Sequence, residues 1–318
     1  MGTHKITQPL SEYRSCLAGW DTRSSVRNKP ARLLAENDRT QLFFSTSLAP
    51  FVSHPLVVER GEACVREVLA RCLYDYLDFT AILEQETVNP VVLRLTRDAY
   101  GLRLPHDMRL DAYRIYCDEA YHAYFSVEMK TQVEVRTGIR SSEVPVEPNF
   151  ARTIRRIKAL LPARLAGLVE LCAAVVSETL ISGVLSKIPA DSAVAPAIRD
   201  MIADHAGDER THHAFFTRAM GAAWPQLDIT TQQALSPHFA DLILAFLTPD
   251  SLAKHRLLLE TGFSNEEACG ILSESTPPSL ILPEVRHAAR STLRLLQRTG
   301  VLDSEGVAEY FAERGIAP

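Results

Sequence analysis

The chain has 318 residues, of which 46% are hydrophobic and 23% are charged, so it can form a folded core and does not resemble a disordered chain. Its net charge of -5 and the absence of a basic run argue against nucleic acid or a membrane surface as a partner. No uncharged apolar stretch reaches membrane-spanning length, the N-terminus lacks a signal-peptide pattern, and the six cysteines form no Cys-x-x-Cys pair. We therefore expect a soluble protein of a reducing, cytoplasmic compartment.

The first part of the chain, up to about residue 55, is polar and irregular. Two segments, around 11–20 and 30–42, are compatible with helices, and no residue pattern there indicates chemistry. We expect this part to wrap around the outside of the fold.

Four long helical patterns follow, over about 58–88, 107–137, 162–187 and 191–220. Their boundaries are set by Pro90, Gly138, Pro189 and Pro225, and by a loop over 141–148. Pro196 falls in the first turn of the fourth pattern, where proline is tolerated. Further helical segments are predicted near 230–247, 249–261, 265–273, 283–298 and 304–314. Because no alternating strand pattern is present, we predict an all-α fold and a single domain over 1–318.

A short pattern, Asp-Glu-x-x-His, occurs twice, at 118–122 and at 208–212. Residues three apart on an α-helix lie on one face, so each pattern directs a carboxylate and an imidazole to the same point. Two such pairs, with one glutamate from each of two other helices, can hold two iron or manganese ions inside a four-helix bundle. A single pair is weak evidence, because this spacing often arises by chance on a solvated face. Two pairs on two long helices are much harder to produce accidentally.

The two additional glutamates can be located in the other helical patterns. Glu178 is the single acid in the apolar stretch 171–181, where a bare carboxylate would be costly to bury without a partner. The helix before Pro90 offers Glu84 and Glu86, which point about 200° apart on a helix, so only one can face the core. We choose Glu84, because it continues the apolar positions of that helix better.

The last helix of the bundle adds another ligand candidate. His205 lies four residues before Glu209 and seven before His212, in one stripe along two turns. An alternative for His205 is a core histidine bonded to a carbonyl group, and His213 points about 100° away, as a surface or neighbouring residue would. The predicted metal ligands are Glu84, Glu119, His122, Glu178, His205, Glu209 and His212. Their four carboxylates would balance the charge of two divalent ions.

Six further polar or aromatic positions lie close to the predicted ligands in sequence. Asp118 and Asp208 either accept hydrogen bonds from the metal-bound histidine of the opposite helix or are ordinary polar neighbours. The tyrosines of the second helix could store a radical, but we favour core and cavity lining for them. These tyrosines are Tyr113, Tyr116, Tyr121 and Tyr124.

This constellation resembles the ferritin-like diiron N-oxygenases, which include the p-aminobenzoate N-oxygenase of aureothin biosynthesis and the arylamine oxygenase of the chloramphenicol pathway. The segments 118–123 and 205–212 look like the two ligand helices of that family, which uses four glutamates and three histidines. The seven residues proposed above match that set in order and spacing. The resemblance covers about 55–220 well and the C-terminal helices more loosely.

The resemblance implies a ferritin-like bundle over about 58–220, with C-terminal helices over 228–316 covering a substrate pocket. It also implies O₂-dependent oxidation of an arylamine or an amino-acid-like amine to a hydroxylamine, nitroso or nitro product, through a peroxo intermediate on two iron ions. Manganese remains an alternative metal. The implied partners are the amine and an electron donor such as a reductase or ferredoxin, with a homodimer as one option for the assembly. The expected setting is secondary metabolite biosynthesis.

The substrate-binding residue is expected on a C-terminal helix. Arg286, Arg290 and Arg294 form one stripe on a C-terminal helix, and an arginine suits a substrate carboxylate. Arg286 is our candidate, against a solvated basic face as the alternative. Two rival functions also remain open, namely another diiron carboxylate oxygenase such as a C–H hydroxylase, and a non-catalytic ferritin-like metal-binding bundle.

Overall fold

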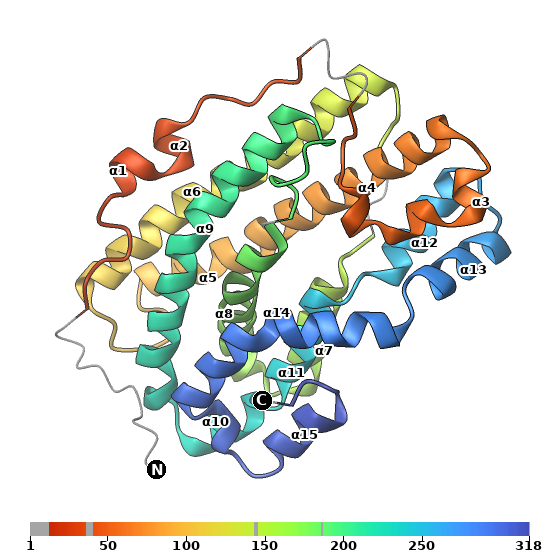
Figure 1. Ribbon diagram of the computed structural model, residues 1–318. Coiled ribbons are helices and arrows are strands. Elements are labelled where there is room, and N and C mark those ends of the chain that lie inside the picture. Colours follow the sequence, from red (N-terminus) through yellow and green to blue (C-terminus); the bar gives the residue numbers. More distant parts are fainter. Residues whose placement is uncertain (1–12, 36–40, 143–145, 186, 318) are drawn as a thin grey trace.

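The computed structural model describes residues 13–35, 41–142, 146–185 and 187–317 (Figure 1). Within these ranges the regular structure is helical, and the extended pairing is limited to one bridge between Leu42 and Val194. The predicted all-α, ferritin-like fold is confirmed. No helix of the described residues is long and apolar enough to cross a membrane. The six cysteines are all free.

The core consists of four helical rods. They are α4 (Glu62–Leu83) with its continuation α5 (Asn89–Thr96), α6 (His106–Thr137), α8 (Ala166–Leu185) and α9 (Pro196–Ala223). α6 packs against α4, α5 and α9, and α9 packs against α8 (Figure 1). Two predicted boundaries hold, because α6 ends before Gly138 in a left-handed conformation (φ 74°) and α9 begins with Pro196 in its first turn. The fourth pattern therefore begins later than the predicted residue 191.

The prediction that the first core helix breaks before Pro90 is wrong. A π-helical segment, η5 (Glu84–Val88), joins α4 directly to α5, and Pro90 lies in the first turn of α5. Proline lacks an N–H group and its ring clashes with the carbonyl of the preceding turn in a regular α-helix. The wider π turn changes the hydrogen-bond pattern just before the proline, so the rod continues to Thr96 without a loop.

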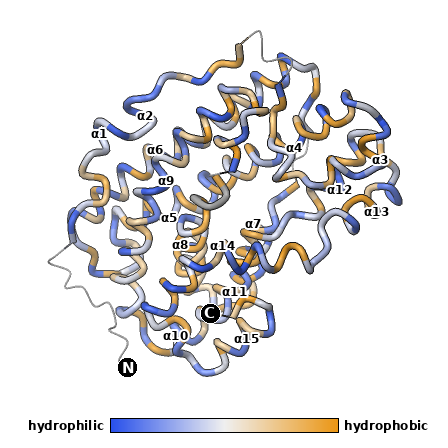
Figure 2. The backbone as a smooth tube through the Cα atoms, in the orientation of Figure 1, coloured by the Kyte–Doolittle hydropathy of each residue, from blue (hydrophilic) through white to orange (hydrophobic). Residues whose placement is uncertain are grey.

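Helix α8 is apolar over most of its length, and Figure 2 shows this segment as largely hydrophobic in the middle of the molecule. It has neighbours on several sides, because α7 (Asn149–Leu160), α9, α11 (His238–Leu247) and α14 (Pro278–Thr299) all pack against it. α7 was not predicted. Its apolar residues Phe150, Ile154 and Ile157 have helical spacing and are buried, so the signal was present in the sequence.

The C-terminal part packs on the core as further helices. They are α10 (Ile229–Leu235), α11, α12 (Ser251–Glu260), α13 (Asn265–Ser275), α14 and α15 (Val307–Glu313). The predicted single helix over 230–247 is two helices, separated at Ser236 and Pro237. α14 begins at Pro278, before the predicted residue 283, and contains Pro283 within it.

The N-terminal part lies outside the core, as predicted, but its helices differ from the expected ones. The described residues of 11–20 and 30–42 do not form the expected helices, and residues 36–40 lie outside the described ranges. The elements present are α1 (Trp20–Arg23), α2 (Ser25–Asn28), η3 (Thr46–Leu48), η4 (Pro50–Ser53) and α3 (Pro55–Val58). α2 contacts both α6 and α9 (Figure 1).

Candidate metal centre

The seven predicted ligands converge in the interior of the bundle, and all seven are buried. Glu84 is the first residue of η5, Glu119 and His122 come from α6, and Glu178 comes from α8. α9 contributes the remaining three on one face, at the spacing of four and then three residues. Glu86 is exposed, as expected from its orientation relative to Glu84.

These residues form two groups that share one member. One ligand atom from each of Glu84, His122, His205 and Glu209 lies within 4.8 Å of the others, and the same is true of Glu119, Glu178, Glu209 and His212. Glu209 belongs to both groups. Two neighbouring sites with a shared carboxylate are the arrangement that a dinuclear metal centre requires.

Glu119 also spans the two groups. Its Oε1 lies 2.8 Å from Nδ1 of His212, and its Oε2 lies 2.8 Å from Nδ1 of His122. In both histidines it is therefore Nδ1 that faces the cluster. In His205 it is Nε2, which lies 3.2 Å from Glu209 Oε1 and 3.9 Å from Glu84 Oε1.

Many atoms of the cluster that could bind a metal form no hydrogen bond within the described residues, although some of them lie close together in the contacts just given. These atoms are both carboxylate oxygens of Glu84, Glu178 and Glu209, Oε1 of Glu119, Nε2 of His205 and Nδ1 of His212. Buried polar atoms nearly always have partners, because leaving one unpaired costs about 1–3 kcal/mol. The residues present therefore fit two metal ions, which would bind these oxygens and nitrogens together.

The charges of the cluster shift the pKa values of its members strongly. Burial and the neighbouring charge of Glu119 raise the pKa of Glu84, and burial with the charge of Glu209 raises that of Glu178. Burial alone would lower the pKa of His122, but the charge of Glu119 and the contact with Asp208 raise it to about 10. Without a cation nearby, the neighbouring negative charges therefore favour the protonated forms of Glu84 and Glu178.

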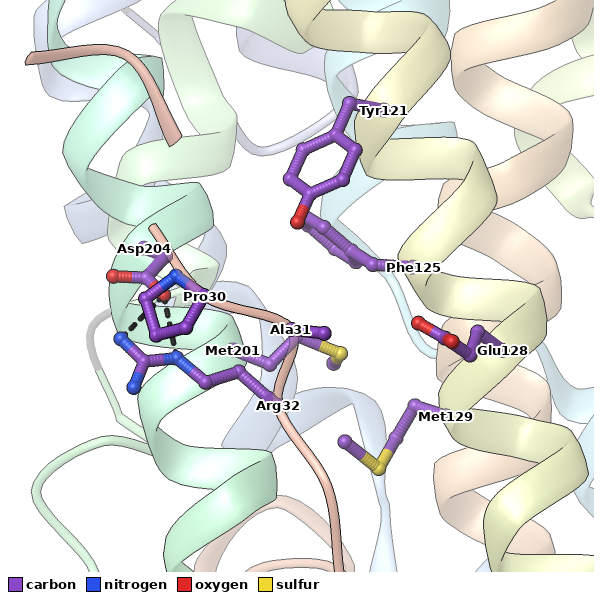
Figure 3. A pocket seen from close by; sticks show the side chains of 9 residues that line it. All are labelled: Pro30, Ala31, Arg32, Tyr121, Phe125, Glu128, Met129, Met201 and Asp204. Atoms are coloured by element: carbon purple, nitrogen blue, oxygen red, sulfur yellow. Dashed lines mark hydrogen bonds and ion pairs between the residues drawn. The ribbon is translucent and has the colours of Figure 1, made fainter. Parts of the chain in front are cut away.

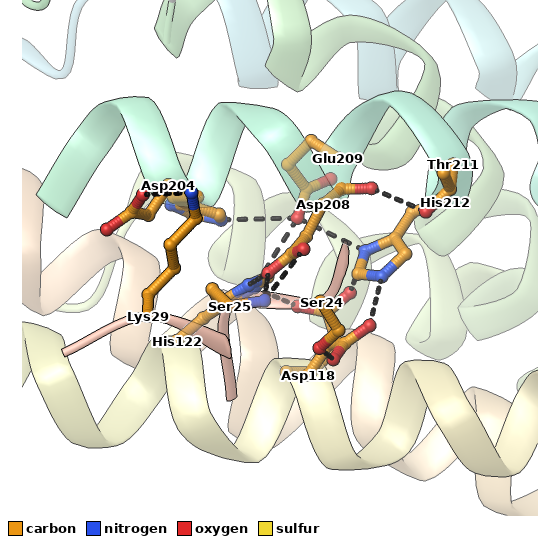
Figure 4. A network of polar contacts seen from close by, with 12 residues as sticks. Ser24, Ser25, Lys29, Asp118, His122, Asp204, Asp208, Glu209, Thr211 and His212 are labelled. Atoms are coloured by element: carbon orange, nitrogen blue, oxygen red, sulfur yellow. Dashed lines mark hydrogen bonds and ion pairs between the residues drawn. The ribbon is translucent and has the colours of Figure 1, made fainter. Parts of the chain in front are cut away.

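Asp118 and Asp208 contact the histidines of the opposite helices. Nε2 of His212 lies 3.1 Å from Asp118 Oδ2, and Nε2 of His122 lies 3.1 Å from Asp208 Oδ2 (Figure 4). An aspartate that accepts the proton of Nε2 leaves the lone pair of Nδ1 for a metal. The arrangement is symmetric, because the aspartate of each of the two helices, α6 and α9, contacts the histidine of the other.

Sequence reasoning missed the residues that hold these aspartates. Ser24 Oγ and Trp20 Nε1 donate to Oδ1 of Asp118, the latter at 2.8 Å, and the backbone N–H of Ser25 donates to Asp208. The sequence of the N-terminal part contains no pattern that indicates chemistry. The partners lie 94 or more residues apart in sequence, so no local pattern could reveal them.

A small cavity lies beside the cluster, between α6, α9 and the segment Pro30–Arg32 (Figure 3). Phe125 lines it and also packs on the cluster, with its ring centre 5.4 Å from that of His122 and 5.7 Å from that of His205. The cavity has a volume of about 10 Å³, which is sufficient for about one water molecule. Arg32 at its edge is paired with Asp204 at 2.7 Å.

The structure does not place Arg286 at the cluster. Its side chain is exposed on α14, and its guanidinium donates to the carbonyl of Gly315 near the C-terminus. Arg290 and Arg294 are exposed too, so the arginine stripe is a solvated face of the helix. Two other α14 side chains approach the ligand helix α8: Oγ1 of Thr292 lies 2.9 Å from that of Thr179, and the hydroxyl of Ser291 donates to the carbonyl of Thr179.

The prediction that the four tyrosines of α6 line the core and a cavity is wrong for three of them. Tyr113, Tyr116 and Tyr124 are exposed, whereas Tyr121 is half-buried and lines the cavity beside Phe125. The aromatic content of the helix was interpreted as core, but most of these rings lie on the outer face.

A family model described as P-aminobenzoate N-oxygenase AurF matches residues 16–300, which include α1 to α14 and all seven clustered residues. No curated protein matches the chain.

Proposed function

Because the chain belongs to the p-aminobenzoate N-oxygenase AurF family, we propose that it is a non-haem diiron N-oxygenase that oxidises the amino group of a small molecule with O₂. The family resemblance inferred from the sequence is confirmed. One observation carries the proposal: the seven buried carboxylate and imidazole side chains form two groups that share Glu209. Their unpaired donor atoms are those that two cations would bind.

In this proposal each group holds one iron ion. Glu84, His122 and His205 would hold one ion, and Glu178 and His212 would hold the other, while Glu119 and Glu209 contact residues of both groups. Carboxylates and imidazoles suit iron, and manganese with the same ligands is the alternative metal. When bound and reduced, the two ions would supply the electrons and the open positions that activate O₂.

The protein contributes orientation and the exclusion of water. Asp118 and Asp208 fix the proton of His212 and His122 on Nε2, so both rings present Nδ1. All seven ligands are buried, which limits the loss of oxidising equivalents to water. Phe125 separates the cluster from the small cavity, and we propose that the amine enters past this ring.

The proposed reaction needs an external electron donor. Conversion of an amine to a hydroxylamine inserts one oxygen atom into an N–H bond, and the second oxygen atom leaves as water after it takes up two electrons and two protons. A reductase or a ferredoxin is the proposed donor. The proposed substrates are arylamines or amino-acid-like amines in secondary metabolism, and further rounds would give nitroso and nitro products.

Oxygen isotope labelling with a panel of amines tests this function. The protein loaded with two Fe²⁺ ions per chain and reduced is mixed with ¹⁸O₂ and p-aminobenzoate, other arylamines or amino acids, and the products are identified by mass spectrometry. Label on the nitrogen of an amine is the expected result. Glu86→Ala is the matched control, because Glu86 is exposed and lies only two residues after the ligand Glu84.

The same experiment separates the two rival functions. Label on carbon in place of nitrogen would identify a C–H hydroxylase and contradict the proposal. Uptake of O₂ that no amine accelerates, together with reversible iron loading, would identify a ferritin-like metal store.

A further inference from the structure

The N-terminal segment 20–25 crosses the bundle where α6 and α9 carry the two aspartates of the metal centre. Figure 4 shows Ser24 and Ser25 directed at Asp118 and Asp208, which in turn face His212 and His122. We propose that Trp20, Ser24 and Ser25 are positioning residues that hold both aspartates, and through them both histidines, in the geometry that binds metal. This inference rests on the proposed metal centre.

The contacts of Asp118 divide between its two oxygens. Oδ1 accepts from the hydroxyl of Ser24 and, at 2.8 Å, from the indole N–H of Trp20. Oδ2 lies 3.1 Å from Nε2 of His212. The two donors from the N-terminal segment therefore fix the carboxylate plane, and the other oxygen remains directed at the imidazole. Asp118 and Ser24 are both buried, so water cannot replace the missing donors easily.

Asp208 is held in a different way. The backbone N–H of Ser25, the first residue of α2, lies 3.1 Å from both of its oxygens, and Oδ2 also contacts Nε2 of His122 at 3.1 Å. A backbone donor cannot be removed by changing the side chain. The position of this N–H depends instead on the segment as a whole, which Trp20 and Ser24 anchor to Asp118.

Loss of these donors should weaken metal binding rather than folding. Residues that orient metal-bound histidines typically change metal affinity or activity by about 10–100-fold. Without Ser24 and Trp20, Asp118 can rotate, and the ring of His212 can turn its Nδ1 away from the cluster. The four core helices pack on one another through buried apolar residues rather than through these donors, so the fold should persist.

Cobalt titration of the metal-free protein tests the inference. Co²⁺ binds carboxylate and imidazole sites, and its visible absorption reports the geometry of its ligands. Trp20→Phe and Ser24→Ala should each lower Co²⁺ affinity by about 10–100-fold and change that absorption. Ser24→Thr, which retains the hydroxyl, should restore both readouts. The matched control is Thr22→Val, because Thr22 is exposed and its hydroxyl donates to the carbonyl of Gly19 rather than to either aspartate.

The outcomes distinguish the inference from the function on which it rests. If the wild type takes up two Co²⁺ ions and Trp20→Phe and Ser24→Ala match it in affinity and spectrum, the positioning role is wrong and the metal centre stands. If the wild type takes up none, the proposed diiron function fails first. Circular dichroism of the metal-free variants verifies that a lost signal is not a lost fold.

Discussion

Two buried carboxylates of this protein, Asp111 and Glu178, have opposite surroundings. Asp111 on α6 accepts hydrogen bonds from Tyr13, Ser15, the backbone N–H of Cys16 and Arg114, at 2.7 to 3.0 Å. Glu178 on α8 is equally buried, but neither of its oxygens has a hydrogen-bond partner among the described residues.

The difference separates a structural acid from a ligand. A carboxylate that its own chain satisfies needs no cation, and Asp111 joins the N-terminal segment to α6. A carboxylate in an apolar helix with no donor is stable in the charged form only if a cation is supplied. Burial alone would have grouped the two residues together, and only the count of donors distinguishes them.

The largest expected effect concerns the shared ligand. Glu209→Ala should reduce bound iron from about two ions per chain to about none, because Glu209 belongs to both groups. Glu178→Ala, which removes a ligand of one group, should lose at least one ion. Iron analysis of the purified variants measures both, with Glu86→Ala as the control that retains two. Equal loss in the Glu86 and Glu178 variants would show that the comparison of donors misidentifies ligands.

Stability without metal should change in opposite directions for the two acids. Asp111→Ala should lower the free energy of unfolding by about 3 kcal/mol, because Tyr13, Ser15 and Arg114 lose their acceptor. Glu178→Met, which removes two unpaired oxygens and keeps the volume, should raise it by about 1–3 kcal/mol. Urea unfolding of the metal-free proteins measures both values. A loss of stability in both variants would contradict the distinction.

The smallest expected effect concerns Asp241 on α11, another acid with its own donors. Although burial would raise its pKa, contacts with His238 and Arg314 lower it to about 2. A carboxyl whose pKa is lower in the folded state stabilises the protein above its unfolded pKa, and this contribution is lost as the pH falls toward 2. Asp241→Asn should therefore cost about 1 kcal/mol at neutral pH, after allowance for solvent screening.

The pH dependence provides the measurement for Asp241. The difference in unfolding free energy between wild type and Asp241→Asn should be constant from pH 7 to about 5 and should narrow as the pH falls from about 4 to 2. Urea unfolding at several pH values determines it. A difference that grows on acidification would have the wrong sign for a carboxylate held by Arg314.

The ligand helices could be predicted because their evidence is local. A carboxylate and an imidazole three residues apart share a helical face wherever that helix packs, so the two Asp-Glu-x-x-His patterns were sufficient for α6 and α9. Glu84 and Glu86 differ by their angle about one helix, and the structure buries the first and exposes the second. The isolated acid in α8 was visible from its apolar neighbours alone.

The remaining features depend on contacts between distant parts of the chain. Trp20 and Ser24 meet Asp118 across 98 and 94 residues, and their own surroundings in the sequence show only an irregular polar segment. The sequence could not place Arg286 for a related reason, because a stripe of arginines on a helix does not reveal which face of that helix the core covers. The tyrosines of α6 were placed inside on their residue type, while the period of the whole helix indicated an outer face.

The π turn at Glu84–Val88 adds one residue to what would otherwise be an unbroken α-helix. An extra residue rotates everything after it by about 100°, so the buried residues Val91, Val92 and Leu95 of α5 reach the interior only because that residue is present. Deletion of one exposed residue, such as Gln85, should therefore destabilise the fold far more than a substitution at the same position. Length, rather than side-chain chemistry, is the property of this short stretch that an evolving gene would have to preserve.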